Sequence, residues 1–195
     1  MARYGKAHKQ ATRRRILAAA GRRLKRDGLA GSGIATLMAD AGLTNGAFYA
    51  HFASKEDLVA NAIAEQLGEQ RESFRAQPPG RAGVEQIVRR YLSVPHRDDP
   101  EGGCPSAALL DEIGRATDAT KRAYTAGLLG ALDDIAARLA PDEPHAARLT
   151  TLGVFALLVG TLQLSRALAD RHLADEVLEQ GIRNALALTG AEQQR

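Results

Sequence analysis

The chain contains 195 residues, of which 45% are hydrophobic and 25% are charged, and its formal net charge is +3. This length suits one large domain or a small domain followed by a larger one, and the apolar content supports a real core. A single cysteine, Cys104, excludes an intramolecular disulfide and is typical of a reducing compartment. No apolar stretch of the signal-peptide type follows the basic N-terminus, so we expect a cytoplasmic protein.

Basic residues are concentrated at the N-terminus. Residues 1–26 hold ten Lys and Arg and no acidic residue, which leaves 16 basic and 23 acidic residues in the rest of the chain. This asymmetry predicts that the N-terminal end meets a polyanion while the remainder stays solvated. The alternative is a basic tail without a partner.

The N-terminal third predicts four helices. The first is expected over residues 10–26, with Gly28 as the C′ residue after its end. Short helices follow over 34–41 and 45–51, and Thr44 is placed to cap the second of them.

The fourth helix begins at "SKEDL", where Ser54 is the N-cap and Asp57 stands at N3 in a capping-box arrangement. It reaches about Arg75, before "QPPGRAG" breaks it. Further helices are expected over 82–94, 105–117, 119–139, 144–171 and 173–188, with a loop "PHRDDPEGG" after the first of these. Alternating β-branched runs are absent, so the chain predicts an all-α protein of about nine helices.

Residues 33–52, "GIATLMADAGLTNGAFYAHF", pair two short helices around an "AGLT" turn. This is the spacing of a helix-turn-helix, in which the second helix enters the major groove of DNA. The ten basic residues upstream would supply attraction to phosphate that does not depend on sequence. Any two short helices can imitate the pattern, so the residues that follow it decide its specificity.

The stretch "AGLTNGAFYAHFASKEDLV" resembles the DNA-binding signature of the TetR family of bacterial transcriptional regulators. A preceding helix that ends in "RDG" and about 125 helical residues afterwards agree with that resemblance. One departure is "GSG" at residues 31–33, where the family usually caps the second helix with Thr or Ser. Either Ser32 caps one residue early or Gly33 serves as a weaker cap.

The resemblance implies a basic arm over 1–9, a three-helix helix-turn-helix domain over 10–70 and a larger helical ligand-binding and dimerisation domain over 71–195. It implies a homodimeric repressor that binds a palindromic double-stranded DNA operator and is released by a small-molecule effector. An activator of the same fold stays open, as does a regulator that senses oxidants or electrophiles. The resemblance implies no cofactor and no membrane partner.

DNA contacts are implied for residues in and around the second helix of the motif, namely Thr44, Asn45, Gly46, Ala47, Tyr49, His51 and Lys55. Asn45 could bond adenine and Ala47 could contact a thymine methyl. Tyr49, His51 and Lys55 are expected at phosphates, with a solvated polar position as the alternative for the last two. Phe48 and Phe52 are expected to pack behind the helix.

Two apolar stripes near the C-terminus fit the four-helix bundle that TetR-family dimers share. The dimer candidates are Leu149, Leu152, Ala156, Val159, Gln163, Leu178, Ile182 and Leu186. The alternative is that these stripes close the core of one chain, and the sequence does not separate the two sets. The uncharged run over 149–165 is expected to be a helix at a helix–helix interface rather than a membrane span.

A ligand pocket is expected among central apolar residues of the C-terminal domain. The candidates are Tyr91, Leu109, Ile113, Tyr124, Leu128, Phe155 and Leu162. Cys104 precedes Pro105 at the start of a helix, where the helix dipole favours a thiolate, so it is a candidate sensor. The alternative is a small buried apolar side chain.

Other functions have less support. An enzyme could pair Cys104 with His96 or His145, but the sequence around these residues resembles neither a nucleophile elbow nor an oxyanion loop, so no enzyme is expected. The five histidines lack the spacing of metal ligands, so no metal site is expected either. A nucleoid-type protein would need basic charge spread over the whole fold.

Overall fold

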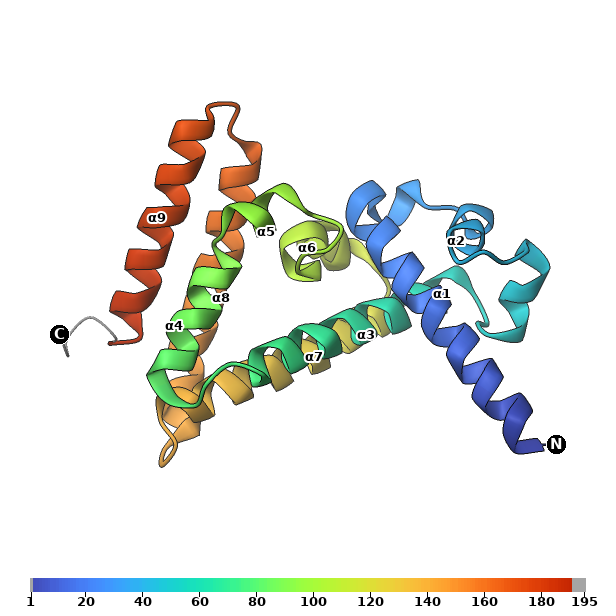
Figure 1. The fold of residues 1–195 in the computed structure, drawn as a ribbon, viewed down its shortest axis with the longest axis horizontal. Coiled ribbons are helices and arrows are strands. Elements are labelled where there is room, and N and C mark those ends of the chain that lie inside the picture. The colour runs from blue at the N-terminus through green and yellow to red at the C-terminus, as the bar shows by residue number, and fades with distance from the viewer. Residues whose placement is uncertain (1, 191–195) are drawn as a thin grey trace.

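The computed structural model describes residues 2–190, with side chains from residue 7 onward, and this part of the chain is helical without a strand. The helices are α1 (Ala2–Gly31), α2 (Ile34–Asp40), the 3₁₀-helix η1 (Asn45–Ala50), α3 (Lys55–Arg75), α4 (Gly80–Tyr91), α5 (Val94–Asp98), α6 (Pro105–Arg115), α7 (Asp118–Leu139), α8 (Pro144–Ala167) and α9 (Arg171–Leu188). The all-α fold is therefore confirmed. In Figure 1, α1, α2 and η1 lie at one end of the molecule, whereas α4, α8 and α9 lie at the other.

The first helix starts earlier and ends later than expected. It begins at Ala2 rather than at residue 10, so the expected arm over 1–9 is helical from its second residue. Gly28 interrupts α1 with φ 80°, as the predicted C′ glycine would, but a last helical turn follows it. Glu112 of α6 stabilises this kink, because its Oε2 accepts a hydrogen bond from the Leu29 N–H at 2.7 Å.

Two other boundaries differ because of local caps. The expected loop after α4 contains α5, which Ser93 caps by accepting the His96 N–H at 3.3 Å. The long helix α8 ends at Ala167 instead of continuing to about residue 171, because Asp170 caps α9. The Asp170 carboxylate accepts the N–H groups of His172 and Leu173 at 2.9 and 3.2 Å.

The apolar interior forms two clusters. The first joins α1, α2, η1 and the N-terminal part of α3 with Leu109 and Ile113 of α6. The second joins α4, α7, α8 and α9 with Phe74 near the end of α3. The expected domain boundary near residue 70 thus falls within α3, a continuous helix that contributes to both clusters.

Candidate nucleic-acid interface and ligand cavity

The second helix of the motif is a 3₁₀-helix, η1, rather than an α-helix. Thr44 stands at its N-cap with extended backbone angles, but its side chain accepts no capping hydrogen bond. Thr44, Asn45 and Gly46 are exposed, and the Tyr49 side chain is 71% exposed. Ala47 is half-buried against the N-terminal core.

Two phenylalanines fix η1 from behind. Phe48 is fully buried and Phe52 is 3% exposed, so the expected packing role of both is confirmed. Their ring centroids are 5.8 Å apart, and the Tyr49 ring meets Phe48 edge-on at 5.1 Å. The aromatic cluster therefore presents its phenol outward while its two apolar rings hold the helix in place.

Arg13 of α1 braces the corner between η1 and α3. Its guanidinium lies 4.3 Å from the centroid of the Phe52 ring and donates to the His51 carbonyl oxygen. It also donates to Asn61 Oδ1 at 2.9 Å. This basic residue therefore supports the motif from inside and is not free to meet a polyanion.

Several other N-terminal basic residues have partners within the chain. Arg23 pairs with Asp40 and with Asp27, and Arg26 pairs with Asp27. The exposed basic side chains for which the structure records no partner, among the described residues before α2, are Lys9, Arg14, Arg15 and Arg22. The N-terminal charge predicted from the sequence is thus partly used to hold the domain together. The side chains of residues 1–6 lie outside the described part.

His51 and Lys55 are both half-buried beside η1. Burial, followed by the nearby positive charges of Lys9 and Arg13, lowers the pKa of His51. Its Nδ1 is buried and has no hydrogen-bond partner within the chain. The ring is therefore neutral near pH 7, and it would meet a phosphate through a hydrogen bond rather than through charge.

The helix after the motif is capped as expected. Ser54 Oγ accepts the Asp57 N–H at 3.2 Å, and the Asp57 carboxylate accepts the Ala53 N–H at 3.0 Å. The sequence left open whether Ser32 or Gly33 caps α2. The N-cap is Gly33, and no side chain makes a capping hydrogen bond there. Ser32 instead donates to the Gly28 carbonyl at the kink of α1, at 3.2 Å.

A cavity of about 610 Å³ lies where the N-terminal domain meets the helices that follow it. Its wall comes from α1, α3, α4, α5 and the segment that leads into α6. The lining residues that matter below are Lys25, Gln66, Phe74, Tyr91, His96 and Cys104. These elements surround the centre of the view in Figure 1.

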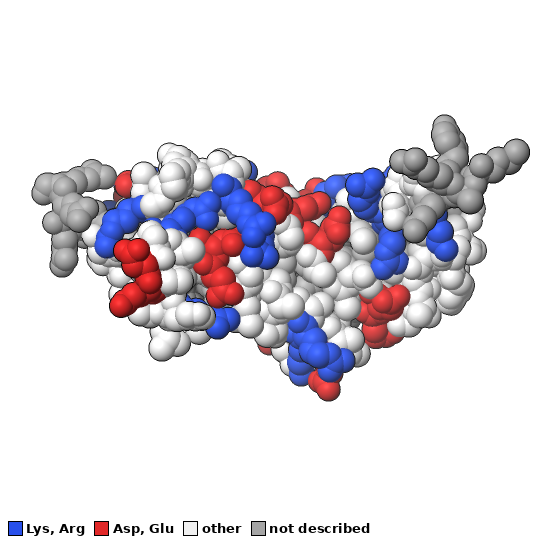
Figure 2. Space-filling model, turned by 90° about the horizontal axis from the view of Figure 1, so that it is seen from below, with Lys and Arg blue, Asp and Glu red and all other residues white. Residues whose placement is uncertain are grey.

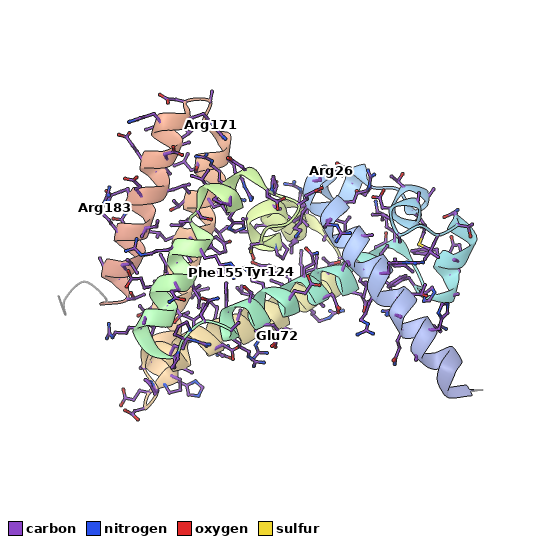
Figure 3. The ribbon with its side chains drawn as sticks, in the orientation of Figure 1. Arg26, Glu72, Tyr124, Phe155, Arg171 and Arg183 are labelled. Carbon is purple, nitrogen blue, oxygen red and sulfur yellow. The ribbon has the colours of Figure 1, made fainter. Side chains whose placement is uncertain are left out.

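Only Tyr91 among the seven residues expected to form a pocket lines this cavity. Leu109 and Ile113 belong to the N-terminal core, and Tyr124 packs against it. Leu128, Phe155 and Leu162 fill or pack against the C-terminal core. Figure 3 shows Phe155 and Tyr124 projecting toward the middle of the molecule. The central apolar residues form the core, whereas most residues that line the cavity carry polar or charged side chains, so a choice of central apolar residues missed them.

The inner end of the cavity holds a small polar cluster. Cys104 is 3% exposed and stands at the N-cap of α6, and its Sγ donates to Gln70 Oε1 at 3.3 Å. His96 Nε2 accepts the Cys104 N–H at 3.0 Å, and burial lowers the pKa of that imidazole. Lys25 Nζ donates to the Gly103 carbonyl oxygen at 2.7 Å, so α1 is tied to the segment before α6.

The outward face of α8 is apolar. Leu149 is 79% exposed and Leu152 is 44% exposed, and Ala156 and Gln163 are exposed on the same helix. A Cβ added at Gly153 or Gly160 of this helix would meet nothing within 4 Å. The remaining dimer candidates, Val159, Ile182, Leu178 and Leu186, are buried in or packed against the core of the chain itself. The structure thus shows which of these candidates are exposed and which are buried in, or packed against, the core of the chain itself.

Within the described residues, α8 is also the one helix whose length and apolar content would suffice to cross a membrane. About a third of its most apolar 18-residue window is buried inside the chain, where α8 packs against α7 and α9. Basic and acidic residues alternate over the face seen in Figure 2, so positive charge does not cover that face.

Comparison with known proteins identifies the N-terminal domain. The family model for bacterial regulatory proteins of the tetR family matches residues 16–68, which include α2, η1 and most of α3. No curated protein matches the chain.

The fold of the whole chain is shared with solved structures. The reduced form of E. coli NemR covers 90% of this chain and 95% of its own, with 17% identity and a TM-score of 0.75. A TetR-family transcriptional regulator from Cytophaga hutchinsonii covers 92% and 96%, with 20% identity and a TM-score of 0.73. Bacillus subtilis FadR in complex with stearoyl-CoA covers 86% and 96%, with 16% identity and a TM-score of 0.59. The N-terminal domain thus matches the tetR family model, and the chain shares the helical fold of solved structures that include TetR-family transcriptional regulators.

Proposed function

We propose that the chain is a homodimeric repressor that acts in the cytoplasm, binds a palindromic operator and releases it when a small molecule occupies the cavity. The carrying observation is the position of that cavity. Lys25, on the helix whose Arg13 braces η1, forms part of its wall. A ligand in the cavity would therefore contact the helix that supports the DNA-reading element. Coupling between the cavity and the DNA-binding surface requires that the ligand bind one orientation of α1 more tightly than another.

The DNA-facing surface in this proposal consists of Thr44, Asn45, Gly46 and Ala47 together with Tyr49, His51 and Lys55. The exposure of η1 and of the Tyr49 ring supports this assignment. A dimer would place two such surfaces in successive major grooves, about 34–36 Å apart. The exposed basic side chains of α1 would add attraction to the phosphates that depends on salt.

The dimer would be formed by the outward face of α8. Exposed Leu149 and Leu152 support this, because an apolar stripe on a soluble chain is normally covered. Gly153 and Gly160 leave room for a neighbouring helix to approach closely.

The DNA-binding part of the proposal is tested by selecting bound fragments from genomic DNA and footprinting the selected sites. A protected palindrome supports a specific dimeric regulator, whereas uniform protection contradicts it. Transcription in vitro from a promoter that overlaps the site separates a repressor from an activator by the sign of the effect. The matched pair Lys55→Ala and Lys121→Ala removes one charge near η1 and one exposed charge on α7. We expect only the first to weaken binding.

A second candidate function is redox sensing through Cys104. Two observations favour it: the thiol lines the cavity, and it stands at the N-cap of α6. The relative E. coli NemR is known in a reduced form. Hydrogen peroxide would convert the thiol to a sulfenic acid, with water as the other product. The experiment compares operator binding before and after mild peroxide treatment. Loss of binding that is abolished in Cys104→Ser supports the sensor, and loss that persists in Cys104→Ser contradicts it.

A further inference from the structure

Lys25 is a buried ammonium group that makes no direct ion pair, although Glu69 and Asp99 lie close enough to act on its charge. Its residue is 8% exposed, and its Nζ makes one hydrogen bond, to the neutral Gly103 carbonyl. Among the described residues no carboxylate lies within ion-pair distance of it, although Arg23 and Arg26 on the same helix both have such partners. An ammonium group has three protons to donate, so two remain available here. Burying a cation in this state is unfavourable unless something else pairs with it.

Two more buried polar atoms in the same wall make no hydrogen bond of normal geometry, although the Tyr91 hydroxyl lies beside Cys104. The Tyr91 hydroxyl belongs to a residue that is 3% exposed, and the Gln66 Oε1 belongs to one that is 8% exposed. Burial raises the pKa of Tyr91, so its phenol stays protonated and keeps a proton to donate. Buried polar groups are normally hydrogen-bonded, and a cluster of unsatisfied ones around a cavity indicates a site for a polar ligand.

The charge at the inner end of the cavity is positive. The acidic lining residues Glu69 and Asp99 are exposed, as is the basic Arg90. Asp99 already accepts the Gly102 N–H at 2.9 Å. His96 is neutral because burial lowers its pKa, and its Nδ1 contacts the Tyr91 carbonyl at 2.7 Å. Lys25 is therefore the charged lining residue that is buried with the ligand, whereas the other charged lining residues are exposed.

We propose that the cavity binds a small organic acid with an apolar ring, whose carboxylate pairs with the Lys25 ammonium and accepts the Tyr91 hydroxyl proton. A carboxylate offers enough lone pairs for both donors and supplies the direct ion pair that Lys25 lacks. The ring would lie against the apolar part of the wall, which includes Phe74 and Ile87. Gln66 Oε1 is an acceptor, so the site favours an acid that also carries a hydroxyl group.

This proposal rests on the proposed function only in treating the cavity as the effector site. It assigns the recognition of the ligand's charge to α1, a helix of the DNA-binding domain. The acid would join α1 to Tyr91 of α4 through one carboxylate, alongside the existing bond from Lys25 to Gly103.

The test measures binding of three acids and their carboxamides to the purified full chain by calorimetry and ligand-detected NMR. The probes are 4-hydroxybenzoate, 3-phenylpropanoate and cyclohexanecarboxylate. We expect the wild type to bind at least one acid about tenfold more tightly than its amide, since one charge-assisted pair contributes about 1.4 kcal/mol or more. The preference should vanish in Lys25→Gln and persist in Arg22→Gln, which removes an exposed charge from the same helix. Tyr91→Phe should weaken acid binding several-fold.

Equal affinity for acids and amides, a preference that survives in Lys25→Gln, or no acid binding at millimolar concentration would each overturn the proposal. If Lys25→Gln does not fold, the wild-type ratio of acid to amide affinity and the Tyr91→Phe result still decide it. Operator binding is measured separately on the same samples. If an acid binds but DNA is not released, the proposed ligand class is supported and the proposed release mechanism is contradicted. If the chain binds no specific DNA, only the proposed regulator function is contradicted.

Discussion

Replacing Lys25 with methionine gives a pH-dependent change in stability that measures how strongly the fold disfavours the ammonium. Burial lowers the pKa of Lys25 from its ordinary value of 10.5 to about 8. A cationic group whose pKa falls on folding destabilises the protein below the folded pKa. This penalty disappears as the pH rises through the unfolded value.

The magnitude follows from that shift. One pKa unit corresponds to about 1.4 kcal/mol, so the penalty is about 3 kcal/mol at about pH 7 and about 1.5 kcal/mol at about pH 9.5. Methionine also leaves the Gly103 carbonyl without its donor, which costs about 1–3 kcal/mol at either pH. The net effect at pH 7 is therefore small. The difference in unfolding free energy between Lys25→Met and wild type should fall by about 2 kcal/mol over this interval.

Urea denaturation of both proteins at the two pH values measures this difference, because other titrating groups are common to both. Lys121→Met serves as the control, since it makes the same substitution at an exposed lysine of α7. A Lys25→Met difference that stays constant within about 0.5 kcal/mol would refute the reasoning, because the ammonium would then be as well solvated as in the unfolded chain.

Phe52→Ala should lower the unfolding free energy by about 3–5 kcal/mol in urea titration, because the ring is 3% exposed; a loss below about 1 kcal/mol would contradict its packing role. Tyr49→Ala should weaken operator binding several-fold at a fixed salt concentration without lowering the melting temperature, since its side chain is 71% exposed. Unchanged affinity in a gel-shift titration would remove it from the DNA-facing set. Leu149→Asp should shift the chain from dimer to monomer in light scattering, because it would bury a carboxylate in the proposed interface. A dimer of unchanged stability would contradict the assignment of α8 to the dimer interface.

Features set by neighbouring residues could be predicted from the sequence. The Ser54 cap with Asp57 is local, and so is the need for glycine at position 28. The burial of Phe48 and Phe52 also followed from their place in the family motif. In each case the physical cause lies within a few residues of the effect.

The cavity could not be predicted in the same way. Its wall combines Lys25, Gln66, Tyr91 and Cys104, which are far apart in the sequence and lack a common pattern. The burial of Lys25 in particular has no sequence signal, since the residue lies in a run of basic residues that reads as a solvated surface. Its buried hydrogen bond joins α1 to Gly103, which lies 78 residues further along the chain.

The two faces of α8 show the same limit. Periodicity places Leu152 and Val159 on one predicted stripe, yet Leu152 is 44% exposed and Val159 is 4% exposed. Which side of an apolar helix meets its own chain depends on how α7 and α9 pack against it, and that is a tertiary property.

The helix α3 connects the two ends of the molecule as a single rigid rod. It begins at Lys55, close to η1, and its last two turns line the cavity with Gln70 and Phe74. At 1.5 Å per residue its 21 residues span about 31 Å. A tilt of only about 5° at the cavity end would therefore move Lys55 by about 3 Å. That displacement is as long as a hydrogen bond, so a small change at the cavity would suffice to break the phosphate contact that we propose for Lys55.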